Sequence, residues 1–103
     1  MKATVLTQLK QLKNKYQNIG FYIVGVFGSY AREEQTLQSD IDIVYSVDKS
    51  FIHRYGGWGA IVEIEKIKQD IQTTLGIPKV DLATSDSNNQ TLQKAIKESI
   101  IYV

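Results

Sequence analysis

Hydrophobic residues recur at helical spacing in the first part of the chain. Four of them follow one another at steps of four, three and four residues: Val5, Leu9, Leu12 and Tyr16. Lys and Gln fill most positions between them, so the apolar residues share one face of an amphipathic helix predicted over residues 3–17. Residues 18–20 are expected to end this helix, because Gly20 suits a left-handed cap.

Three later segments have the character of short strands. Residues 21–27 form an almost continuous β-branched and aromatic run bounded by Gly, which predicts a strand covered on both faces. Residues 41–47 begin with alternating acidic and apolar side chains, and residues 80–83 are apolar apart from one acid. These patterns predict a second and a third strand.

The segments between and after these strands predict further helices. Residues 29–34 are expected to form the first turn or two of a short helix, followed by a polar loop. Residues 60–75 carry an apolar stripe at helical spacing: Ile61, Ile64, Ile67, Ile71 and Leu75. Gly76 and Pro78 are expected to end that helix, whereas residues 48–59 show no clear pattern.

A last helix is predicted over residues 88–101. Asn88 or Asn89 can cap its start, and three apolar residues are expected to face inward: Leu92, Ile96 and Ile100. The order of all these elements predicts an α/β (α+β) fold in which helices pack on a small mixed sheet. The 103 residues fit one domain, so residues 1–103 are expected to form a single domain.

Composition and charge exclude several classes of protein. The net charge of +1 lacks the basic excess of a duplex binder, so nucleic acid is not expected as a partner. The absence of Cys excludes disulfides, thiolate metal sites and cysteine nucleophiles. No run approaches the ~18 apolar residues of a membrane span, and a cytoplasmic location is expected. A chain this short would gain stability from a partner or from self-association as a homo-oligomer.

Gly28 and Ser29 stand where the first predicted strand ends. A Gly at this place lets the backbone approach a ligand, and the N–H groups at a helix start carry about half a positive charge, which suits a phosphate. The hydroxyl of Ser29 adds a further donor. Gly-Ser also marks ordinary turns, and the pair alone does not decide between the two readings.

Asp40 and Asp42 flank Ile41 at the start of the second strand. Residues two apart in a strand point to one face, so the two carboxylates converge while the Ile residues enter the core. At an effective dielectric of 20, two charges ~4 Å apart repel by about 4 kcal/mol, which favours a bound cation or a raised pKa. Mg²⁺ suits such oxygen ligands, although an exposed strand edge with two solvated acids would show the same pattern.

Asp81 is an acid inside the otherwise apolar third strand. If this strand lies beside the second, Asp81 reaches the face that Asp40 and Asp42 share. Three acids would then support two metal ions ~3.5–4 Å apart. Strand ends often carry an Asp, so Asp81 gains meaning only together with the other two.

Taken together, three segments of the chain resemble the DNA polymerase beta superfamily of nucleotidyltransferases: Gly28-Ser29-Tyr30-Ala31-Arg32, Ser39-Asp40-Ile41-Asp42 and Val80-Asp81-Leu82. Ten residues separate Ser29 from Asp40, which lies within the gap usual for that family. The first segment is similar to that of the minimal nucleotidyltransferase branch, whose members are about this long. The resemblance spans roughly residues 20–85 and implies a polymerase-beta-like nucleotidyltransferase fold.

The resemblance also implies roles for these residues. The nucleotide, ATP or another nucleoside triphosphate, would be held by four residues: Gly28, Ser29, Arg32 and Ser39. The metal-binding catalytic carboxylates, for two Mg²⁺ ions, would be Asp40, Asp42 and Asp81. The family commonly has Gly directly after the Arg, whereas this chain has Glu33 and then Glu34. These acids either weaken nucleotide binding or point outward.

Several polar and aromatic residues keep two readings. Arg32 either neutralises triphosphate charge or forms an ion pair with a nearby acid: Glu33, Glu34 or Asp40. His53 is the only His, and a surface or packing role is favoured over a catalytic one. The aromatic side chains at positions 51, 55 and 58 can serve core, lid or interface, and at least one of them is expected in the core.

The leading functional hypothesis is Mg²⁺-dependent transfer of AMP from ATP to a hydroxyl group. Minimal members of the family resemble antitoxins encoded beside a small all-helical HEPN ribonuclease toxin, where the acceptor is a Tyr of the toxin. This resemblance implies a HEPN-type partner and a role as antitoxin. Two alternatives stay open: a non-catalytic antitoxin that neutralises its partner by occlusion, and a nucleotidyltransferase for small molecules such as aminoglycosides.

Overall fold

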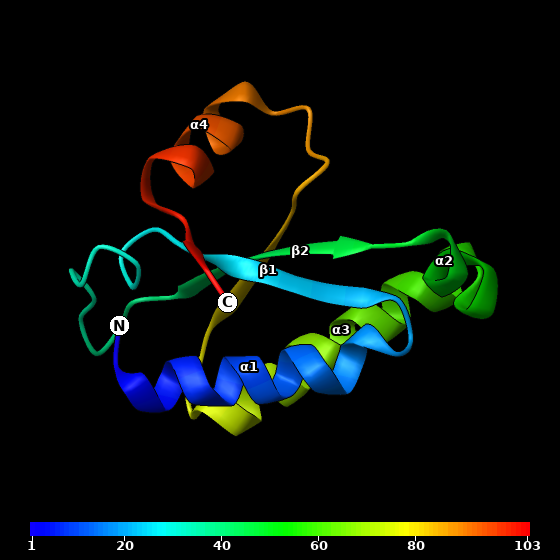
Figure 1. Cartoon of the computed structure of the whole chain (residues 1–103), viewed down its shortest axis with the longest axis horizontal. Coiled ribbons are helices and arrows are strands. Elements are labelled where there is room, and N and C mark those ends of the chain that lie inside the picture. The colour runs from blue at the N-terminus through cyan, green and yellow to red at the C-terminus, as the bar shows by residue number, and fades with distance from the viewer.

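A four-stranded mixed sheet runs through the middle of the protein (Figure 1). The structure is a computed structural model that describes all 103 residues. The strands are β1 (Phe21–Phe27), β2 (Ile41–Val47), β3 (Val80–Thr84) and β4 (Ile101–Tyr102), in the sheet order β3-β2-β1-β4. β1 runs antiparallel to β2 and β4, whereas β2 and β3 are parallel. The predicted mixed sheet is therefore confirmed.

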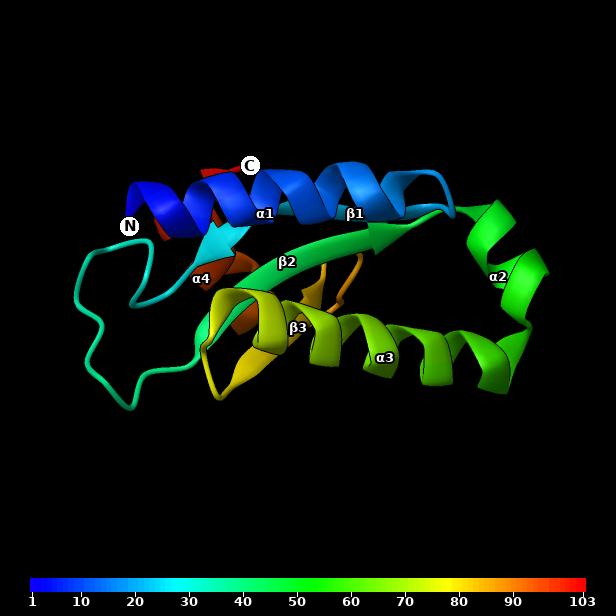
Figure 2. The same cartoon turned by 90° about the horizontal axis from the view of Figure 1, so that it is seen from below.

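Helices cover both faces of this sheet. They are α1 (Ala3–Gln17), α2 (Lys49–Tyr55), α3 (Gly57–Leu75) and α4 (Gln90–Ser99). α1 and α3 lie side by side across one face (Figure 2), while α4 stands on the other face (Figure 1). No helix combines the length and the apolar composition needed to cross a membrane.

The main core lies between the sheet and the α1–α3 layer. Its thirteen buried residues include Leu9 and Leu12 of α1, as the helical spacing predicts. Ile41 and Ile43 enter the same core from β2, because alternate residues of a strand share a face. The intervening residues of β2 therefore face α4.

A second, smaller core lies between the sheet and α4. It consists of three buried residues: Phe27, Val44 and Ile96. Phe21 and Val26 belong to the main core, so β1 contributes to both cores. The prediction that residues 21–27 form a strand covered on both faces is confirmed.

The prediction of a short helix over residues 29–34 is wrong. The chain makes a single turn there, in which the N–H of Arg32 donates to the carbonyl of Gly28 at 3.1 Å. Glu33 then takes a φ of 58°, in the left-handed region, and the helical path ends.

The segment without a clear pattern, residues 48–59, folds into α2 and the start of α3. Asp48 caps α2 by accepting a hydrogen bond from the N–H of Phe51 at 3.1 Å. Phe51 is buried, which confirms a core position for at least one of the aromatic residues, whereas Trp58 is 82% exposed. Ile61 was expected to face inward, but it lies outside because Ala60, rather than Ile61, continues the inward stripe of Ile67.

The last helix is shorter than predicted. α4 ends at Ser99, and Ile101–Tyr102 pair with β1 as a fourth strand. Of the two Asn residues offered as caps, Asn89 accepts the hydrogen bond from the N–H of Leu92 at 3.1 Å. The end of the chain therefore adds a strand beside β1 instead of a final helical turn.

Candidate active site

Asp42 and Asp81 lie next to each other on the face of the sheet that α4 covers in part. In the parallel pairing of β2 and β3, these two residues are direct partners. Val44 and Ala83, two residues further along each strand, pack in the small core under α4. Because residues two apart share a face, both acids point to the α4 side. Two extended segments thus bring their carboxylates to one place.

The electrostatic cost of this arrangement appears at Asp42. Its pKa is raised from 3.8 to about 6, first by burial and then by the negative charges of Asp81 and Asp40. The positive charge of Arg32 opposes this rise. A half-buried carboxylate with a raised pKa beside a second acid is typical of a functional site.

Gly28 lets the chain pass close to Asp42. Its φ is 75°, which favours Gly, and a Cβ at this position would overlap the Oδ2 atom of Asp42. A glycine is therefore needed here both for the backbone conformation and for the carboxylate in front of it. This is the close approach that the Gly-Ser pair predicts.

The turn after Gly28 presents unpaired backbone donors. The N–H groups of residues 29, 30 and 31 make no hydrogen bond within the protein, whereas those of the three following residues are bonded inside the turn. Successive free N–H groups form a concavity that attracts anions. The turn next to Asp42 therefore has the donors that a phosphate group requires.

Ser99 contacts this turn from the end of α4. Its Oγ accepts a hydrogen bond from the N–H of Gly28 at 3.1 Å and donates one to the carbonyl of Ala95. Sequence reasoning missed this residue, because it lies 71 positions from Gly28 and belongs to no motif. The contact joins the end of α4 to the Gly28 turn.

The two acids after Arg32 are both paired. Glu33 binds the ammonium group of Met1 at 2.7 Å, and Glu34 binds Nε of Arg32 at 3.1 Å. Of the ion pairs considered for Arg32, the one with Glu34 is therefore formed. Neither Glu contributes to the raised pKa of Asp42.

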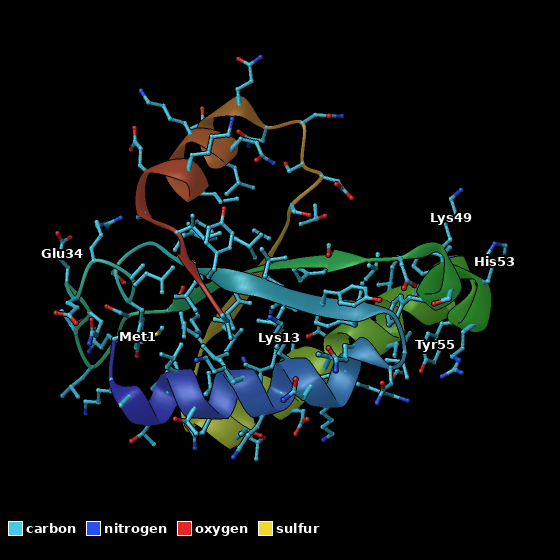
Figure 3. All side chains as sticks on the ribbon, viewed as in Figure 1. Met1, Lys13, Glu34, Lys49, His53 and Tyr55 are labelled. Carbon is cyan, nitrogen blue, oxygen red and sulfur yellow. The ribbon has the colours of Figure 1, made fainter.

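The other two candidate residues, Ser39 and His53, form no hydrogen bond with the acidic pair. Ser39 organises the preceding loop, where its Oγ accepts a hydrogen bond from the N–H of Thr36 at 2.8 Å. His53 is exposed on α2, at the opposite end of the molecule from Met1 and Glu34 (Figure 3). This placement agrees with the surface role favoured for His53.

The largest cavity is not at the acids. It has a volume of about 740 Å³ and lies between the start of α1, the loop 35–37 and the chain after α3. None of the three Asp residues lines it, and only Tyr30 connects it with the turn after Gly28. The site is therefore assigned from its chemistry and not from the size of this cavity.

A known family accounts for nearly the whole chain. Residues 7–103 match the family described as "Polymerase beta, Nucleotidyltransferase". The chain belongs to this family. The matched range contains the Gly28 turn and all three acids, so the resemblance carried by these motifs is confirmed.

One relative and two solved structures show how far this similarity extends. A protein of Methanocaldococcus jannaschii, "Putative protein adenylyltransferase MJ1379", is 41% identical over 96 residues, which cover 91% of this chain and 85% of that protein. A solved structure described as "Structure of putative minimal nucleotidyltransferase" has a TM-score of 0.74 at 21% identity, with 97% and 93% of the two chains covered. Another, "Crystal structure of the toxin-antitoxin with AMP-PNP", has a TM-score of 0.65 at 19% identity, with 93% of this chain and 69% of that chain covered. The predicted fold is confirmed.

The carboxylates of this nucleotidyltransferase fit a divalent cation as a pair. Asp42 and Asp81 offer hard oxygen donors, and their mutual repulsion would be relieved by a cation between them. Asp40 precedes β2 and acts on Asp42 through its charge, but no three His, Asp or Glu side chains are gathered closely enough to hold a metal. The arrangement has two donors in place and leaves other positions for phosphate oxygens.

Proposed function

We propose that this nucleotidyltransferase transfers AMP from ATP to a hydroxyl group of a protein. The family assignment supports nucleotidyl transfer, and the 41% identical relative bears the name of a protein adenylyltransferase. The single observation that carries the proposal is the pairing of Asp42 with Asp81 beside the Gly28 turn. The pairing would place a cation beside the turn that would hold the phosphates.

The turn would hold the triphosphate of ATP. The free N–H groups of residues 29–31 and the hydroxyl of Ser29 are donors for phosphate oxygens. Arg32 uses Nε for Glu34, which leaves its two terminal nitrogens for a further anion. Gly28 keeps this polyphosphate close to Asp42, since no side chain separates them.

The acids would act at the α-phosphate. Asp42 and Asp81 would hold Mg²⁺, and Asp40 would add its negative charge beside them. The ion would neutralise charge on the phosphates and on the leaving pyrophosphate. The acceptor oxygen forms a bond to the α-phosphorus, and the bond from that phosphorus to the β-phosphate bridging oxygen breaks. The proton of the acceptor hydroxyl passes to Asp81, which is the more exposed partner of the pair.

We further propose that the acceptor is a Tyr of a small all-helical toxin of the HEPN type and that the chain acts as its antitoxin. One of the similar solved structures is described as a toxin-antitoxin with AMP-PNP, an analogue of ATP. Neither cavity of the protein is lined by the three Asp residues, so an acceptor side chain presented by another protein suits the site better than a small acceptor molecule that needs enclosure. The partner would present its Tyr hydroxyl to Asp81.

The experiment uses ATP labelled at the α-phosphate, Mg²⁺, the purified chain and the protein encoded by the neighbouring gene. Label is expected on a Tyr of that protein with the native chain and with Asp86→Asn, an exposed loop control. Asp42→Asn is expected to lower the transfer rate by at least about a hundredfold, because it removes a ligand of the cation. Undiminished labelling by Asp42→Asn would refute the proposal.

A second readout separates catalysis from occlusion. The variant with both Asp40→Ala and Asp42→Ala is tested for neutralisation of the partner's toxicity in cells. Catalysis predicts that neutralisation is lost while the two proteins still bind each other. Full neutralisation by this variant would instead establish occlusion and overturn the catalytic proposal.

A further inference from the structure

An apolar stripe on the outer face of α3 has no partner within the protein. Three large side chains on this stripe are mostly exposed: Trp58 at 82%, Ile61 at 58% and Val62 at 52%. Ile61 and Val62 follow Trp58 by three and four residues, so the three side chains form one continuous patch. The inner face of the same helix is already filled by residues 60, 67 and 71, which are buried. The patch is therefore additional to what the fold requires.

The same outer face changes character further along the helix. The stripe continues at helical spacing to Glu65 and Lys66, which are both exposed. At its other end, α3 begins without a capping side chain and without an acid in its first turn. The first turn of α3 therefore has no acidic side chain to offset its positive dipole end, and the exposed Glu65 lies where the start of a second, antiparallel α3 could approach it.

We propose that a second copy of this chain covers the patch, with the two α3 helices packed antiparallel about a two-fold axis at Val62. Trp58 and Lys66 are each four residues from Val62, so each Trp58 would lie against Lys66 of the other copy. The indole ring then contacts the alkyl stem and the ammonium group of Lys66. Glu65 of each copy approaches the uncapped start of the other α3.

The patch fits a second copy because it is self-complementary. A two-fold interface uses the same surface twice, so an apolar half-helix must meet a suitable surface on the same element. α3 provides both surfaces, the apolar patch and the charged segment after it. In the proposed dimer Glu65 lies near the start of the other α3, and Lys66 lies near the other Trp58. α3 also lies in the layer opposite α4, so pairing through it leaves the acid face of the sheet open (Figure 2).

The size of the patch determines how tightly the proposed dimer should associate. One helix pair buries less than the ~800 Å² per partner of a standard interface, so the dimer should dissociate in the micromolar range. Sedimentation of the intact chain from roughly 1 µM to 1 mM is expected to show reversible dimerisation. Ile61→Asp combined with Val62→Asp should weaken it at least about thirtyfold, because two charges enter the centre of the contact. Thr73→Asp, exposed on the same helix but beyond the contact, should leave it unchanged.

Cross-linking tests the register directly, because the chain contains no Cys. Val62→Cys places two thiols at the two-fold axis, and a short thiol-specific cross-linker should give covalent dimer. Thr73→Cys separates the two thiols by about 33 Å along the antiparallel helices and should stay monomeric. Circular dichroism checks that each variant is folded.

Three results would overturn the proposal. They are a monomer at every concentration, a dimer unaffected by the two Asp substitutions, and cross-linking of Thr73→Cys as readily as of Val62→Cys. A chain that stays monomeric and has its patch covered only by the neighbouring gene's product would assign the surface to that protein instead. None of these readouts involves AMP transfer, so they are independent of the proposed function.

Discussion

Asp42 couples the charge of the site to the stability of the fold. Burial, Asp81 and Asp40 raise its pKa from 3.8 to about 6 in the folded protein. Between about pH 4 and pH 6 the folded state therefore keeps a proton that the unfolded chain has lost. A folded state that binds more protons loses stability as the pH rises through this window. Above pH 6 the ionised Asp42 is a destabilising group.

Asp42→Asn is therefore expected to stabilise the protein at pH 7.5. The full pKa shift corresponds to about 3 kcal/mol, and solvent screening at a half-exposed site reduces the expected gain to about 1 kcal/mol. At about pH 3, where Asp42 is largely protonated in both states, the gain should disappear. Urea unfolding of the native and variant chains at both pH values measures the difference.

The control for this prediction is Asp86→Asn, which removes an exposed carboxylate from the loop before α4. Its free energy of unfolding should be close to that of the native chain at both pH values. Mg²⁺ should stabilise the native chain and have little effect on Asp42→Asn, because the variant lacks one of the two paired donors. A variant less stable than the native chain at pH 7.5 would contradict the assignment of Asp42 as a strained acid.

Gly28→Ala separates the needs of the site from those of the backbone. Gly28 and Gly76 both have positive φ, at 75° and 67°, so an Ala costs about 1 kcal/mol at either position. Only at Gly28 does the new Cβ meet another side chain, the carboxylate of Asp42, whereas Gly76 faces open space. Gly28→Ala and Gly76→Ala are expected to have similar unfolding midpoints. AMP transfer should be lost in Gly28→Ala and kept in Gly76→Ala. Equal activities would show that the close approach has no catalytic importance.

Glu33 has a backbone conformation that Gly adopts more easily than other residues. The sequence shows only that the Gly usual in the family is missing, and the structure adds that Glu33 has a φ of 58°. Glu33→Gly should raise the unfolding temperature by about 2–5 °C, because Gly adopts this conformation without strain. Glu33→Gln keeps the backbone strain and removes the ion pair with Met1, which is exposed and contributes little. A larger effect of the Gln variant would show that the ion pair matters more than the strain.

At the scale of elements, periodicity predicts the parts that are governed by burial. The predicted bounds of α1, β1, β2 and β3 agree with the structure to within a residue at each end. The apolar residues of α1 follow a period of 3.6, those of β1 form a nearly continuous run, and β2 and β3 are apolar segments with acids at single positions. From sequence, Asp81 could be placed near Asp42 only if the third strand lay beside the second. The register of β2 and β3, which makes the two acids direct partners, depends on the crossover through α3.

The elements that sequence reasoning missed depend on local caps and distant pairing. α2 lies between its N-cap Asp48 and its C-cap Gly56. With only seven residues it has no apolar stripe, so the two caps alone did not identify it as a helix. Residues 101–102 continue the helical pattern of α4 in sequence, but β1 offers an unpaired edge, and pairing with that edge prevails. Ser99 could not be assigned, because its partner Gly28 meets it only through this pairing.

At the scale of the whole molecule, the two faces of the sheet have different tasks. The face under α1 and α3 holds a core of thirteen buried residues, whereas the face under α4 holds three and the acidic pair. Stability therefore resides on one side of the sheet and chemistry on the other. The parts of a protein that move during function come from its less stable regions.

Hydrogen exchange should reveal this division. The amides of α4 are expected to exchange at least about ten times faster than those of β1 and β2, through an opening that leaves the sheet intact. The reason is that α4 is held by one fully inserted residue, Ile96, and by the contact of Ser99 with the Gly28 turn. Ser99→Ala should speed exchange in α4 and at the amide of Gly28, which loses its acceptor, and ATP with Mg²⁺ should slow exchange at the Gly28 turn. Uniform protection across α4 and the sheet would show that both faces unfold as one unit, and the acid face could then not open separately.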